Sequence, residues 1–174
     1  MSNNREKRIY SNYVHMFLAL QKTSKNEKKN CIRAVIKDEK LDLKILEARL
    51  KVIGGQWRIH KTVNARNVEK AKIWLIKHLL DNPENASFTD SAWRTALLQK
   101  ECIYGSRRFM LDIDTKKTDR LVFFEKLIPE ILFKVETPNG WHYITAPFDT
   151  RQICEFPKVT LLRDGYYYVK TIGR

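Results

Sequence analysis

The chain has 174 residues, of which 43% are hydrophobic, and its 33 Lys and Arg outnumber 20 Asp and Glu to give a formal net charge of +13. This length and apolar content suit one compact domain, and the lack of a long apolar segment or an apolar leader excludes a membrane helix and a secretory signal, so we expect a soluble cytoplasmic protein without membrane contacts. Three widely spaced cysteines without a CxxC pair indicate neither a disulfide framework nor a zinc knuckle, whereas the positive charge favours a polyanionic partner, most often nucleic acid.

The first third of the chain is expected to alternate helix and strand. Residues 6–20 place apolar side chains at three- and four-residue steps, which predicts a helix with one buried face. Residues 31–37 form a short β-like run. Residues 41–53 repeat apolar side chains at helical spacing up to Gly54, where a glycine pair ends the helix.

A strand with a polar side follows. Residues 56–63 alternate, so that Arg58 and His60 share the face opposite Trp57 and Ile59. The next segment, residues 65–80, is predicted to be a helix with Asn64 as its N-cap. A third helix is expected to begin near Thr89.

After Gly105 the pattern changes to strands separated by turn signals. The expected elements are a strand at 107–114, a helix at 119–127, strands at 131–137 and 141–147, a turn or short helix at 149–153, and a closing pair of strands at 158–163 and 166–171. This order predicts an α+β fold in one domain, residues 1–174. A helix-rich α/β half, residues 1–104, would pack on an antiparallel sheet of the RNA-recognition (RRM-like) type, residues 105–174.

Two carboxylates stand out in the strand FMLDID. Asp112 and Asp114 are two residues apart, so they share a face while Leu111 and Ile113 point into the core. Such a pair suits Mg²⁺ or Mn²⁺, which take oxygen ligands together with substrate phosphates. A strand that simply ends in solvent explains the same residues equally well.

Two turn signals follow in the second half. Asn139 and Gly140 predict a hairpin with positive φ, and His142 lies just past it. Asp164 and Gly165 predict a second hairpin, and Asp164 is either a turn residue or a third carboxylate near the first two. Asp149 is the reserve candidate for that third acid.

The order of these motifs carries a family resemblance. A strand with Asp-x-Asp, a Gly-x-His hairpin and an apolar strand ending in Asp resemble the three motifs of the archaeo-eukaryotic primase superfamily, the primase-polymerases. The matching residues, which lie within roughly residues 105–170, are Asp112 and Asp114 in FMLDID, Gly140 and His142 in NGWH, and Asp164 in LLRD.

The resemblance implies template-dependent nucleotidyl transfer by a minimal primase-polymerase acting on DNA or RNA. Asp112, Asp114 and Asp164 would be the catalytic acids and would hold two Mg²⁺ or Mn²⁺ ions. His142, beside Gly140, would contact the incoming nucleoside triphosphate. Basic side chains would follow a single-stranded template or primer-template.

Two arginines are further candidates for nucleotide contacts. Arg58 lies on the polar face of its strand, and Arg66 lies at the expected start of a helix, where free backbone N–H groups favour anions. A structural role for either arginine is at least as compatible with the sequence.

Two other functions remain open. A non-catalytic nucleic-acid-binding or regulatory module of a mobile element, such as a phage or plasmid, would use the basic surface and stack bases on Tyr166, Tyr168 or Trp141. A metal-dependent nuclease would use the paired acids with His142.

Overall fold

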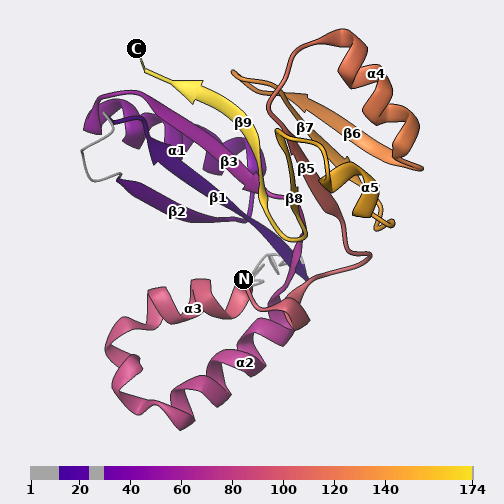
Figure 1. The fold of residues 1–174 in the computed structure, drawn as a ribbon. Helices are drawn as coiled ribbons and strands as arrows, with labels where there is room; N and C mark the ends of the chain where they lie inside the picture. The colour runs from indigo at the N-terminus through magenta and orange to yellow at the C-terminus, as the bar shows by residue number, and fades with distance from the viewer. Residues whose placement is uncertain (1–11, 24–29, 174) are drawn as a thin grey trace, which may run out of the picture.

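The computed structural model describes residues 12–23 and 30–173, which form two antiparallel sheets flanked by helices (Figure 1). The expected α+β class is therefore confirmed. Within these two ranges no helix combines the length and the apolar character that a membrane crossing requires.

The first sheet is built mainly from the first third of the chain. Its strands, in spatial order, are β2 (Cys31–Ile36), β1 (Tyr13–Gln21), β3 (Trp57–Thr62) and β9 (Tyr166–Ile172), and the short β4 (Arg66–Asn67) also pairs with β1. Helix α1 (Glu39–Ile53) covers one face and buries Leu46 and Leu50 against Phe17 and Ile59. The helix begins where the Asp38 carboxylate accepts a hydrogen bond from the Leu41 N–H, and it ends at Gly54, whose φ of 79° favours glycine.

The helix predicted at residues 6–20 is wrong where the structure describes it, because residues 13–21 form β1. The strand is apolar on both faces: Phe17 packs toward α1, while Met16 packs toward two other helices. A strand that is apolar on both faces has no polar alternation, and its apolar run matched helical spacing by chance. Residues 6–11 lie outside the described ranges.

A helical hairpin covers part of the other face of the first sheet. It consists of α2 (Val68–Asp81), the 3₁₀ turn η1 (Pro83–Phe88), α3 (Thr89–Leu97) and a second 3₁₀ turn, η2 (Lys100–Cys102). The predicted start of α3 is confirmed. The predicted N-cap of α2 is wrong: Asn67 caps the helix by accepting from the Lys70 N–H, while Asn64 bonds elsewhere.

The second sheet confirms the RRM-like half. Its strands lie in the order β6 (Ile131–Glu136), β7 (Trp141–Thr145), β5 (Phe109–Ile113) and β8 (Val159–Leu162), with α4 (Thr118–Leu127) and α5 (Arg151–Cys154) on one face. Chain order β5-α4-β6-β7-α5-β8 with all neighbours antiparallel is the βαββαβ arrangement. The helices pack on the face that carries Leu111, Ile113 and Tyr143.

The expected closing pair of strands is wrong. β8 pairs with β5 in the second sheet, whereas β9 crosses over and pairs with β3 in the first sheet, so Asp164 and Gly165 connect two sheets (Figure 1). The Gly165 carbonyl accepts a hydrogen bond from the Val63 N–H, which ties this crossover to the end of β3. The last strand therefore belongs to the same sheet as residues 13–62, and the boundary proposed at residue 104 does not separate the sheets.

Candidate functional site

Asp112 lies in the middle of the second sheet, between two side chains on neighbouring strands. It is directly opposite His142 on β7 and directly opposite Thr160 on β8. Opposite residues of an antiparallel pair share a face, so these three side chains form one row. The Asp112 Oδ1 lies 3.4 Å from the His142 Nε2.

His142 joins the two sheets. Its Nδ1 accepts a hydrogen bond of 2.9 Å from the backbone N–H of Tyr168 on β9, and the residue is only 7% exposed. An Nδ1 that accepts carries no proton, so the ring proton is on the Nε2 that faces Asp112. Both ring nitrogens thus have a protein neighbour.

Asp114 directly follows the last residue of β5. Its N–H donates to the Lys158 carbonyl at 2.9 Å, which continues the pairing of β5 with the β8 side, and Asp114 is exposed. The predicted sharing of a face by Asp112 and Asp114 stays a prediction, because β5 ends at Ile113 and the Thr115 N–H donates to the Ile113 carbonyl across Asp114.

Gly140 brings the β6–β7 hairpin against this strand end. The hairpin is confirmed, but neither Asn139 nor Gly140 has the predicted positive φ. The glycine is required for a different reason: a Cβ there would lie 1.9 Å from the Ile113 carbonyl oxygen. The close backbone approach places the hairpin beside the carboxylate pair.

Asp164 does not join Asp112 and Asp114. Its carboxylate accepts bonds from Arg66 Nη1 at 3.0 Å and Nη2 at 2.7 Å, and from the Asn64 amide at 3.1 Å. Asn64 also bonds the backbone of Arg108, four residues before Asp112 along the chain. Asp112 pairs with Thr160, and Asp164 lies four residues after Thr160, which at about 3.3 Å per strand residue is on the order of 13 Å away.

Arg66 is equally unavailable for the predicted nucleotide contact. Its side chain is 1% exposed, and two of its nitrogens bind Asp164. A guanidinium that is buried and paired in this way holds the crossover between β8 and β9 in place. The structural role left open for Arg66 is the one that its contacts support.

The reserve candidate does not supply a third acid. Asp149 is bound by Arg151, whose Nε lies 3.0 Å from the carboxylate, and this partner lowers the pKa of Asp149 to about 2. Within the described ranges no group of three or more His, Cys, Asp or Glu side chains is arranged to hold a metal ion. The predicted set of three acids around two metal ions is not brought together, because Asp164 is bound to Arg66 and Asn64, and the residue opposite Asp112 on β8 is Thr160.

A second surface lies on the first sheet, on the face opposite α1. The α2–α3 hairpin buries Met16 completely but leaves the next rows of this face partly exposed. We call this partly exposed part of the face the open sheet face. The strand register places in one of its rows Arg33, Leu18, His60 and Tyr168, and in the next row Leu20 and Arg58. Arg58 is thus the one predicted nucleotide-binding arginine that faces this surface.

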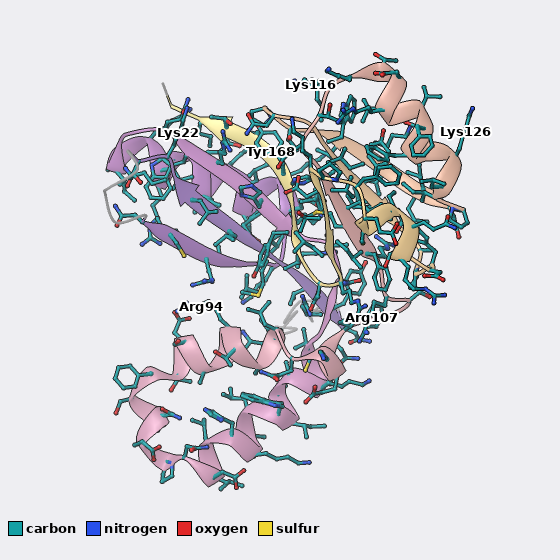
Figure 2. The ribbon with its side chains drawn as sticks, in the orientation of Figure 1. Lys22, Arg94, Arg107, Lys116, Lys126 and Tyr168 are labelled. Carbon is teal, nitrogen blue, oxygen red and sulfur yellow. The ribbon has the colours of Figure 1, made fainter. Side chains whose placement is uncertain are left out.

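The open sheet face and the Asp112 row meet at β9. Tyr168 carries its ring on the open sheet face while its backbone binds His142 (Figure 2). The His60 ring stacks edge-on against Tyr168 with 6.0 Å between centroids. Burial, and secondarily the nearby His142, lower the pKa of His60, so this side chain is a neutral aromatic ring near pH 7.

Sequence reasoning missed the position of Thr160 and the role of Arg33. It grouped Tyr166 with Tyr168, but Tyr166 packs in the core beneath the α2–α3 hairpin. Trp141 packs with the helices of the second sheet and does not reach the open sheet face. Alternation within β2 could have marked Arg33 as facing away from α1, but the pairing of β2 with β1 was required to locate it.

Comparison with protein-family models, curated proteins and solved structures finds no match to this chain.

Proposed function

We propose that the protein binds a single strand of nucleic acid along the open sheet face. The observation that carries this proposal is the placement of Tyr168 on β9, Arg58 on β3 and Arg33 on β2 along one sheet face that the described helices leave partly uncovered. The net charge of +13 adds a favourable long-range field for a polyanion.

The chemistry of the face matches this ligand. Exposed aromatic rings on a sheet stack with unpaired bases, and each such contact is worth about 1–3 kcal/mol. Arg58 and Arg33 lie in adjacent rows, two strands apart, and can bind different phosphates of one strand. Guanidinium groups suit this role because they bind phosphate oxygens in a bidentate fashion. Bound arginines displace counterions, so affinity should fall as salt rises.

Fluorescence anisotropy with a labelled single strand of about ten nucleotides tests the proposal. Tyr168→Ala removes the ring but keeps the backbone N–H that binds His142, and it should weaken binding about 5- to 150-fold, whereas Tyr168→Phe should bind nearly as the parent does. The matched control is Phe88→Ala, which removes an exposed aromatic ring from the tip of the helical hairpin. Equal affinity of Tyr168→Ala and the parent protein would refute stacking on this face.

A second candidate function is template-dependent nucleotidyl transfer. The observation that favours it is the row that places His142 beside Asp112 at the margin of the open sheet face. Asp114 follows two residues later in the chain. The lack of a third acid at Thr160 argues for weak or absent transfer, which is why binding is the first proposal.

Primer extension separates the two functions. The assay supplies a primed template, nucleoside triphosphates and Mn²⁺, and compares the parent with the double substitution Asp112→Asn and Asp114→Asn. Extension that the double substitution abolishes would establish transfer, and shortening of the strands would establish a nuclease. If neither protein extends the primer and the double substitution still binds the nucleic acid as the parent does, the result supports the non-catalytic module.

A further inference from the structure

A groove of about 560 Å³ runs along the outer edge of the first sheet, between β2 and α3. Its charged and aromatic lining consists of Arg33, Lys37, Arg49, Asp90, Trp93 and Arg94. The groove lies at the β2 edge of the first sheet, whereas the Asp112 row adjoins the opposite edge at β9. Figure 2 shows Arg94 projecting from α3 beneath β2.

The groove is strongly basic. Four cations line it against one acid, and that acid, Asp90, is already paired with Arg94. Arg33, Lys37 and Arg49 are exposed and have no ion pair within the described part of the chain. Three like charges held together on a concave surface repel one another, so an anionic ligand that bridges them is favoured.

The groove is continuous with the open sheet face through Arg33. This side chain belongs to the row that leads to Tyr168 and also lines the groove. The four strands from β9 to β2 span about 14 Å at the usual spacing of about 4.8 Å, so a short strand covers the sheet and a longer one reaches beyond it. Because β2 is an edge strand, its outer backbone N–H groups are available as further donors to phosphate.

We propose that the groove along β2 binds the sugar-phosphate backbone of the same single strand that lies on the open sheet face. This inference rests on the proposed function and extends it: the strand runs from Tyr168 across β3 and β1 to Arg33, and then between β2 and α3. Lys37 and Arg49 bind its phosphates, and Trp93 forms the aromatic wall of the groove. The ligand class is therefore a single strand longer than the open sheet face can hold.

The test compares two labelled single strands, one of about 4 nucleotides and one of about 15, at several salt concentrations. Lys37→Ala with Arg49→Ala removes two groove cations without touching the open sheet face. For the long strand, the plot of log affinity against log salt should become less steep by about 1.4 when two phosphate contacts are lost. Relative to the parent, this corresponds to an affinity about 25-fold lower at 0.1 M salt, if the two proteins bind equally at 1 M salt. The short strand should bind as it does to the parent.

The matched control removes the same charge elsewhere, with Lys77→Ala on α2 and Lys126→Ala on α4, both exposed. The control should leave the binding of both strands close to that of the parent. An unchanged slope for the long strand, with Tyr168→Ala still weakening it, would overturn the groove and leave the open sheet face standing. If neither the groove variant nor Tyr168→Ala changes binding, the proposed function itself fails.

Two further outcomes would also overturn the inference. Equal losses for short and long strands would mean that Lys37 and Arg49 act only through net charge. Binding of polyglutamate of about 15 residues as tightly as the long strand, lost in the same groove variant, would assign the groove to an acidic protein segment.

Discussion

Removal of the Asp164 carboxylate should destabilise the protein strongly, because Arg66 would then be a buried cation without its partner. Asp164→Asn keeps the size of the side chain and its turn propensity but loses the negative charge. Arg66 Nη1 and Nη2 bind the two Asp164 oxygens at 3.0 and 2.7 Å, and the arginine side chain is 1% exposed. If Asp164 were instead a metal ligand, its removal would relieve repulsion among carboxylates and would not lower stability.

The magnitude follows from burial. Breaking a buried ion pair by removing one partner costs about 3–5 kcal/mol, and because the Asp164 side chain is 26% exposed, the lower end of about 3 kcal/mol applies. For a domain of this size each kcal/mol lowers Tm by about 2–4 °C, so we expect a decrease of about 6–12 °C. With an m-value of about 2 kcal/mol/M, the urea midpoint should fall by about 1.5 M.

Urea unfolding followed by tryptophan fluorescence measures this change. The control is Asp149→Asn, which breaks the exposed pair with Arg151 and should shift the midpoint by no more than about 0.3 M. The double substitution Arg66→Met with Asp164→Leu replaces the buried pair by apolar groups and should recover part of the loss. A midpoint for Asp164→Asn equal to that of the parent would refute the argument.

Three further predictions concern the site and the sheet around it. Thr160→Asp places another carboxylate directly opposite Asp112 and should increase the affinity for Mn²⁺ measured by calorimetry. Thr160→Asn is the control, and equally weak Mn²⁺ binding by both variants would contradict the pairing of Thr160 with Asp112. Gly140→Ala should cost about 3 kcal/mol, because its Cβ would overlap the Ile113 carbonyl, and an unchanged urea midpoint would count against this close approach. Burial, aided by Lys61, lowers the pKa of His15 from 6.5 to about 4, so between these pH values the unfolded chain binds one more proton than the folded protein. The free energy of unfolding should therefore decrease on acidification, by roughly 1–2 kcal/mol at pH 5 after allowance for partial exposure. His15→Gln should flatten this pH dependence, and stability profiles of the parent and the variant that run parallel between pH 4 and 7 would exclude the role of His15.

The sequence by itself determined the elements whose signals are local. Gly54 marks the end of α1 as predicted, because a glycine with positive φ acts within one turn of the helix. The start was predicted at residue 41, and the Asp38 cap was not identified. The order of strands and helices from β5 to β8 was also readable, because alternation and turn residues repeat over short distances. The carboxylate pair at Asp112 and Asp114 follows from strand geometry alone.

Only the tertiary structure decided which segments these elements meet. A strand that is apolar on both faces, such as β1, carries no periodic signal that separates it from a helix. β9 has two possible neighbours, and its pairing with β3 depends on the position of a strand more than one hundred residues earlier. Asp164 has the same neighbours in the chain whether it binds metal or Arg66. Because the two partners are separated by 98 positions in the sequence, no local pattern reveals the choice. Burial selects the partner, because a guanidinium withdrawn from water requires a carboxylate within hydrogen-bonding distance.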